Sequence, residues 1–327
     1  MKTIEMLDLT RKGSASNGCL ELSGFSFVAI TMLLAGSCFA DDGMPAPTLA
    51  NVPYGPHKRN VLDFWQAKSD EPTPLAVYFH GGGFGVFDKS KIVKKWPATV
   101  KALLDAKISV AAANYRLIQH KPLPAAFHDS RRALQFLRTK SADWNIDATR
   151  VSAWGGSAGA QIAMYLAFHD EMADPESDDP VERQSTRLTC VATRDGQTSR
   201  DYQWWIDHIP EYDKPHRDFH AMFGVKTRAA FLKKMVDVSA MSLITKDDPP
   251  IYMHYAMTSD APVPVPTASN PRAAISFQGH HVVFGLELKE KMDRVDVEVN
   301  LDYPGSKSKH RSVEQFFISK LKRKSDE

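Results

Sequence analysis

The stretch "RVSAWGGSAGAQIAMYLAF", residues Arg150–Phe168, is the most informative part of the sequence for the fold. It begins with a β-prone apolar run, passes through a glycine-rich turn and continues into residues that favour a helix. Ser157 stands in the pattern G-x-S-x-G, between Gly155 and Gly159. A strand that turns sharply into a helix at a serine presents the hydroxyl at the helix N-terminus, where the dipole favours developing negative charge. The stretch predicts a nucleophile elbow at Ser157, and a βα turn with a serine N-cap is the structural alternative.

A second glycine-rich stretch, "AVYFHGGGFGVFDK" at residues 76–89, precedes it. Here an apolar strand-like run ends at His80, and three consecutive glycines begin at Gly81. Glycine lets a backbone bend sharply and pass close to a substrate, and acyl transfer needs hydrogen-bond donors arranged in advance for an oxyanion. We expect His80 to orient this loop. The predicted oxyanion hole consists of the backbone amides of Gly82, Gly83 and Ala158.

Strand-like and helix-like segments alternate along the chain from residue 60 onward. The predicted strands are 60–66, 75–81, 108–117, 149–156, 188–195, 249–259 and 295–305. The predicted helices are 90–107, interrupted at Pro97, then 124–144, 157–173, 281–294 and 312–324. This alternation indicates an α/β fold with a mainly parallel sheet covered on both faces. Residues 41–327 are expected to form one domain, in which the aromatic-rich segment 199–242 is either a lid or a set of helices packed on the core.

The first 40 residues have the organisation of a secretory signal peptide. Arg11 and Lys12 precede an apolar run at 25–36, and small residues lead to a cleavage site after Ala40. The run is shorter than the roughly 20 residues that a membrane-spanning helix needs. We therefore expect export to the periplasm or the medium and no stable membrane span. The alternative is processing as a lipoprotein, with the lipid anchored at Cys38.

Composition excludes several other classes of protein. The 327 residues carry a net charge of +2, and 43% of them are hydrophobic, as in ordinary globular domains. A nucleic-acid partner is not expected, because basic residues do not cluster with aromatics. Acyl transfer by a serine nucleophile needs no organic cofactor, and the histidines lack zinc-site spacing, so neither kind of cofactor is expected. Cleavage after Ala40 would leave Cys190 as the sole cysteine, which we expect to be buried and inert.

The two glycine motifs together resemble a known family. HGGGF at 80–84 followed by GGSAG at 155–159 is similar to the α/β-hydrolase esterases of the hormone-sensitive-lipase and carboxylesterase type. The block that they enclose also resembles the domain of bacterial feruloyl and acetylxylan esterases. Further matching segments are YGPHKRNVLDFW (54–65), FDKS (87–90), NYRL (114–117) and FHDSRRALQFL (127–137). The resemblance covers residues 54–320, with departures at Gly156, often an acid in relatives, and at Phe87, often a glycine.

This resemblance implies an α/β-hydrolase fold and hydrolysis of small or carbohydrate-linked esters through an acyl-enzyme. In such enzymes the order along the chain is serine, acid, histidine. The position after a late strand then implies Asp260 as the acid. His310, in the loop after the last strand, is the implied base, and the pair His280 and His281 is the alternative.

Two other functions remain open from the sequence. The same fold carries other serine hydrolases, such as lactonases and peptidases. An exported binding protein that kept the pocket without a working triad is the other alternative.

Overall fold

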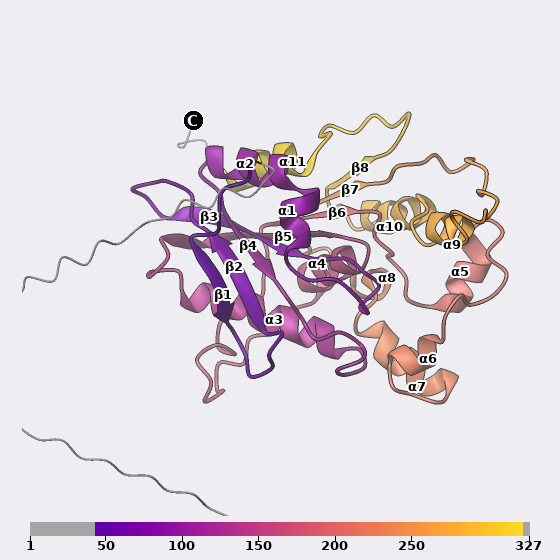
Figure 1. Cartoon of the computed structure of the whole chain (residues 1–327), viewed down its shortest axis with the longest axis horizontal. Coiled ribbons are helices and arrows are strands. Elements are labelled where there is room, and N and C mark those ends of the chain that lie inside the picture. Colours follow the sequence, from indigo (N-terminus) through magenta and orange to yellow (C-terminus); the bar gives the residue numbers. More distant parts are fainter. Residues whose placement is uncertain (1–42, 323–327) are drawn as a thin grey trace, which may run out of the picture. The chain divides into compact units, whose positions relative to one another are not determined.

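A single eight-stranded sheet organises residues 43–322, the part of the chain that the computed structural model describes. The spatial order is β1-β2-β4-β3-β5-β6-β7-β8 (Figure 1). β2 runs antiparallel to β1 and β4, and every pair from β4 and β3 through to β8 is parallel. The strands are β1 (Leu49–Pro53), β2 (Val61–Trp65), β3 (Thr73–Phe79), β4 (Ser109–Ala113), β5 (Ile146–Gly156), β6 (Cys190–Arg194), β7 (Ile251–His254) and β8 (Val299–Asp302).

Helices cover both faces of this sheet. Along β3, Ala76 and Tyr78 point into one hydrophobic cluster, and Leu75 and Val77 point into the other, because successive side chains alternate across a strand. The first cluster lies under α1 (Lys91–Lys95), α2 (Pro97–Asp105) and α11 (Val313–Leu321). The second lies under α3 (Ala125–Thr139), α4 (Ala158–Phe168) and α10 (Val283–Asp293). The predicted α/β fold with a mainly parallel, doubly covered sheet is confirmed, and it is the α/β-hydrolase fold.

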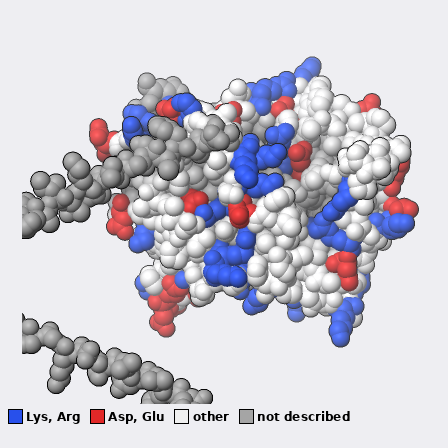
Figure 2. Space-filling model, in the orientation of Figure 1, with Lys and Arg blue, Asp and Glu red and all other residues white. Residues whose placement is uncertain are grey.

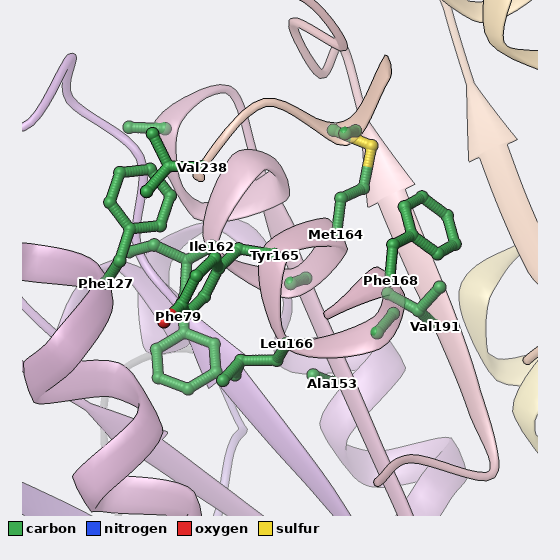
Figure 3. Packing of buried hydrophobic residues seen from close by; sticks show 14 of the residues in the cluster. Phe79, Phe127, Ala153, Ile162, Met164, Tyr165, Leu166, Phe168, Val191 and Val238 are labelled. Atoms are coloured by element: carbon green, nitrogen blue, oxygen red, sulfur yellow. The ribbon is translucent and has the colours of Figure 1, made fainter. Parts of the chain in front are cut away.

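The helix α4 is buried along its whole length. An unbroken apolar sequence gives it no solvent face, so it packs between the sheet and its neighbouring helices. Figure 3 shows its side chains packed among residues of β3, β6 and α3. The labelled residues of α4 are Ile162, Met164, Tyr165, Leu166 and Phe168. This burial fixes the helix whose first turn follows Ser157.

The remaining helices connect the last strands. Segment 199–242 contains α5 (Tyr202–His208), α6 (Phe219–Met222) and α7 (Arg228–Val236), and α8 (Ala240–Leu243) begins within it. α9 (Ala273–Gln278) follows β7 and was not predicted. No described helix is both long enough and apolar enough to cross a bilayer. Figure 2 shows acidic and basic side chains interspersed on one face of the molecule.

Other boundaries differ from the sequence-based prediction. β1 lies before residue 60, where no strand was predicted, because its half-exposed, bulged edge pairing leaves no regular apolar alternation. β7 ends at His254, earlier than the predicted strand, and α4 ends at Phe168. Cys190 is buried and unbridged, as predicted. The predicted signal peptide at 1–40, with Cys38, lies outside the described residues.

Candidate active site

Ser157 occupies a sharp turn between β5 and α4. Its backbone has φ 54° and ψ −116°, a conformation that residues with a side chain rarely adopt. Its amide donates to the carbonyl of Arg194 at 3.0 Å, which ties the turn to β6. A Cβ atom at Gly155 or Gly159 would overlap the carbonyl oxygen of Phe79, so only glycine lets strand and helix approach here. The elbow has the strained backbone of a nucleophile site.

The loop of three glycines lies against this elbow. A Cβ on Gly81 would be 2.7 Å from the carbonyl oxygen of Gly156 and 3.5 Å from the Cβ of Ser157. Gly82 and Gly83 have φ values of 111° and 59°, which favour glycine. The structure thus brings together the two motifs that the sequence separates by more than 70 residues. The oxyanion hole at Gly82, Gly83 and Ala158 remains a prediction that this contact supports.

His80 packs beneath the glycine loop and forms hydrogen bonds that hold it. Its buried ring stacks on Tyr115 with centroids 4.2 Å apart. Arg59 contributes an N–H at 3.3 Å from Nε2, so Nε2 accepts, and Nδ1–H donates to the Gly81 carbonyl at 2.8 Å. Burial lowers the pKa of His80 to about 4, so the ring is neutral at neutral pH. These contacts fit the predicted role of His80 in orienting the loop. Arg59 also donates to the Phe87 carbonyl, and sequence reasoning missed this residue.

The histidine that contacts Ser157 is His280. Its Nε2 lies 3.0 Å from the serine Oγ. Its Nδ1 lies 2.8 Å from the carbonyl oxygen of Ser276, which can only accept, so Nδ1 carries the proton. Nε2 is therefore free to accept the serine proton. Both side chains are partly exposed, so a substrate can reach them.

Buried glutamines hold the turn that carries His280. Gln161, on the first turns of α4, donates through its side-chain amide to the side-chain oxygen of Gln197. Gln197 in turn donates to the carbonyl of Gly279, the residue before His280. This chain of hydrogen bonds links the base-bearing turn to the helix of the nucleophile. Sequence reasoning missed both glutamines; the only signal is one polar residue in the apolar run of α4.

His310, the predicted base, does not lie at Ser157. Its ring packs edge-on against Phe316 with centroids 5.4 Å apart, and its Nε2 lies 3.4 Å from the Oγ of Ser319. Both partners belong to α11, so the loop after β8 turns this histidine under that helix. The structure does not bring His310 to Ser157; the histidine at Ser157 is His280, one of the alternative pair. His281, the other member, is buried and accepts from the amide of Val283 at 3.3 Å.

Asp260, the predicted acid, is exposed in the loop that follows β7. A hydrogen bond from the Thr258 side chain lowers its pKa below the usual value. Among residues 43–322, no histidine forms a hydrogen bond or ion pair with Asp260. Because β7 ends early, at His254, the loop carries Asp260 away from the strand end. The carbonyl of Ser276 occupies the position beside Nδ1 that a triad acid would take.

We expect Asp260→Asn to change kcat/KM for an ester by no more than about threefold, because this carboxylate contacts no catalytic group. Steady-state kinetics on p-nitrophenyl acetate measure the effect, and Asp213→Asn, another exposed change, is the control. A loss of about 10⁴-fold, the size seen when a triad acid is removed, would show that the loop brings Asp260 to the base during turnover.

A second polar group lies at the ends of β7 and β8. Asp302 accepts hydrogen bonds from the hydroxyl of Tyr252 at 3.0 Å, from Nδ1 of His254 at 3.1 Å and from Arg311 at 2.6 Å. Burial raises the pKa of Asp302, but these hydrogen bonds outweigh it and leave the pKa below the usual value. His254, Asp302 and Arg311 line an open cleft of about 620 Å³. Both oxygens of the Asp302 carboxylate thus accept hydrogen bonds, and none of these bonds involves Ser157.

No cluster of three or more potential metal ligands occurs in the described part of the chain. The site contains a serine hydroxyl, an imidazole positioned to accept its proton and a glycine loop beside them. This combination is suited to nucleophilic attack on a carbonyl group.

Curated proteins similar to this chain are carboxylesterases. "Probable carboxylesterase 2" of Arabidopsis thaliana is 33% identical over 104 residues, which are 31% of this chain and 33% of that protein. "Carboxylesterase NlhH" of Mycobacterium tuberculosis is 31% identical over 109 residues, or 33% of each chain. The chain thus spans about one third of the length of these relatives.

Similar folds are found among solved structures over most of the chain. A truncated carbohydrate esterase from gut microbiota has a TM-score of 0.59 and 17% identity, covering 81% of this chain and 89% of its own. An acetyl ester-xyloside bifunctional hydrolase from Caldicellulosiruptor lactoaceticus has a TM-score of 0.57 and 22% identity, covering 79% and 86%. The family model BD-FAE matches residues 62–271, which is more than half of the chain and includes both Ser157 and the glycine loop. The chain therefore belongs to the BD-FAE family of α/β-hydrolases.

Proposed function

We propose that this protein is a serine carboxylic-ester hydrolase that works through an acyl-enzyme. The observation that carries the proposal is the 3.0 Å contact between Ser157 Oγ and His280 Nε2. It places the nucleophile and a base within hydrogen-bond reach, with the tautomer of the base already set by Ser276. The similarity to carboxylesterases supports the same reaction. The contact also argues against a non-catalytic binding protein, because binding alone requires no such pair.

The reaction begins when His280 Nε2 takes the proton of Ser157 as its Oγ attacks the ester carbonyl carbon. The amides of Gly82, Gly83 and Ala158 then donate to the oxygen that becomes negatively charged. The protonated His280 returns the proton to the departing alcohol, which leaves the acyl group on Ser157. Water, activated by the same imidazole, repeats the attack and releases the acid.

The base in this scheme is supported by a neutral group. The carbonyl of Ser276 holds the ring orientation and the tautomer, which is the positioning role of an acid in a triad. A carbonyl stabilises the imidazolium less than a carboxylate would, since it carries only a partial charge. The arrangement is accordingly a serine–histidine dyad that is completed by the backbone.

Small or carbohydrate-linked esters are the proposed substrates. The names of the structural neighbours, a carbohydrate esterase and an acetyl ester-xyloside hydrolase, support the carbohydrate class. We also propose export of the protein, on the sequence of residues 1–40. No step of the reaction requires a metal or organic cofactor.

Active-site labelling tests the proposal directly. Diisopropyl fluorophosphate phosphorylates serines that an adjacent base activates, so we expect a single adduct on Ser157 and loss of p-nitrophenyl acetate hydrolysis in parallel. Peptide mass spectrometry locates the adduct. His280→Ala serves as the control and should label far more slowly. A protein with neither hydrolysis nor an adduct would be a binding protein. Parallel assays on acetylated xylan, feruloyl esters and C2 to C10 acyl esters identify the substrate.

A further inference from the structure

Arg200, a buried arginine with no acidic partner among the described residues, lies behind the glycine loop. Arg200 follows β6, and its side chain is only 4% exposed. Its guanidinium lies 5.5 Å from the ring centroid of Phe84, the residue after the glycines, and 5.7 Å from that of Phe219. Its Nη2 lies 3.9 Å from the sulfur of Met222, and its buried Nε has no hydrogen-bond partner in the described structure.

A second arginine connects this group to the loop itself. Arg217 donates from Nη1 to the carbonyl of Gly83 at 3.3 Å, and the same nitrogen lies 3.7 Å from the sulfur of Met222. Its Nε donates to Nε2 of His216 at 2.9 Å. Burial, followed by the nearby arginines, lowers the pKa of His216 to about 4, so this neutral ring can accept. The guanidinium groups of Arg200 and Arg217 therefore both lie against the sulfur of Met222, beside the predicted oxyanion hole.

Neither arginine has a counter-charge in the part of the chain that the structure describes. Within residues 43–322, no Asp or Glu forms an ion pair with Arg200, Arg217 or Arg272. Burial, followed by the charge of Arg217, lowers the pKa of Arg200 to about 9. Burial, followed by the charge of Arg272, also lowers the pKa of Arg217. Arg228, in the same helical segment, does pair with Asp201. Moving a charged side chain out of water costs free energy, so buried cations are normally paired with an anion. The pair Arg200 and Arg217 is therefore incomplete without one.

The position of the group indicates what completes it. Arg217 is only partly buried, and Arg272 is exposed at the start of α9, the helix that leads to His280. Of the two arginines that meet at Met222, Arg217 is thus the one that a substrate can reach. A carboxylate accepts two N–H groups of one guanidinium side by side, which makes it a fitting partner. The contact of Arg217 with Gly83 puts such a carboxylate next to the reacting carbonyl.

We infer that Arg217, with Arg200 behind it, binds a carboxylate carried by the substrate, so that the site prefers anionic esters. This inference rests on the proposed esterase function. The carboxylate belongs either to the acyl group or to the alcohol, and matched substrates distinguish the two. The rings of Phe84 and Phe219 attract the charge of Arg200 only weakly compared with an anion.

Kinetics on matched ester pairs test this preference. Mono-4-nitrophenyl adipate and its methyl ester differ by a carboxylate on the acyl side, and 4-acetoxybenzoate and its methyl ester differ on the alcohol side. For one pair, we expect kcat/KM to be at least tenfold higher for the anion, since a charge-assisted bond is strong. Arg217→Gln should reduce this ratio to about one, Arg200→Met should reduce it in part, and the control Arg228→Gln should preserve it.

Carboxylate binding, measured without turnover, tests the anion site separately from the proposed esterase function. Adipate or benzoate should raise the melting temperature of both wild type and Ser157→Ala by about 2 °C or more, and not that of Arg217→Gln. Without ligand, Arg200→Met should melt no lower than wild type, because it removes a buried charge. If Arg217→Gln does not fold, Arg200→Met provides the test in its place.

The outcomes are distinct. Equal rates on both members of each pair, with no anion-dependent stabilisation, would overturn the inference and leave the esterase proposal standing. Arg217-dependent stabilisation by carboxylates in a protein that hydrolyses no ester would support the anion site and overturn the proposed function. A clear drop in the melting temperature of Arg200→Met would show that the arginine is a structural element, against the inference.

Discussion

Ser157→Ala is expected to lower kcat for p-nitrophenyl acetate by about 10⁴-fold or more. The hydroxyl is the only group at the elbow that forms the acyl-enzyme, and its removal leaves at most the catalysis due to binding and the oxyanion donors. Stability should change little, because the Ser157 side chain makes no capping hydrogen bond to α4 and alanine tolerates the same backbone about as well as serine. The measurement is steady-state kinetics beside thermal unfolding.

Ser269→Ala is the matched control for this substitution. Ser269 is exposed in the loop after β7, where its hydroxyl forms a hydrogen bond with that of Thr267, so the variant should keep wild-type kinetics. Retention of more than a tenth of wild-type activity in Ser157→Ala would assign the reaction to another nucleophile. An inactive variant that also unfolds below the assay temperature is resolved by Ser157→Cys, which keeps the volume and a nucleophile and should retain slow hydrolysis.

The parts of the site that the sequence predicts are those set by a few adjacent residues. The elbow depends on Gly155, Ser157 and Gly159 between an apolar strand and a helix, and this local pattern has few other physical explanations. The loop at Gly81–Gly83 is predicted for the same reason. Because both motifs follow neighbouring parallel strands, β3 and β5, their carboxyl ends meet at one edge. Local sequence and sheet topology together therefore fix the nucleophile beside the glycine loop.

The base and the acid could not be predicted in this way. Their positions depend on the direction that long loops take after β7 and β8, and such loops contain no short-range signal for it. The side chain of His310 turns under α11 because Phe316 offers it an apolar surface. The turn at His280 is held by Gln161 and Gln197, whose pairing across separate elements is invisible in the sequence. The resemblance implied a histidine in the loop after the last strand, whereas His280 lies between β7 and β8.

His280→Ala and His310→Ala are expected to give opposite results. Without His280, no group accepts the Ser157 proton, and kcat should fall by about 10³-fold or more, with little change in melting temperature, because the ring is partly exposed. His310→Ala should keep kcat within about threefold. It should instead lower the free energy of unfolding by about 1–2 kcal/mol, because it removes a buried ring packed on Phe316.

The comparison is informative because each variant is the control for the other. The same protein batches should be used for kinetics and for urea unfolding, which separates lost chemistry from lost stability. His280→Gln adds a further test, since its amide can fill the space and cannot act as a base; it should be as inactive as His280→Ala. A loss of kcat in His310→Ala at unchanged stability, with His280→Ala active, would contradict the dyad. The base would then come from the loop after β8, and that loop would have to unpack from α11 before Ser157 could react.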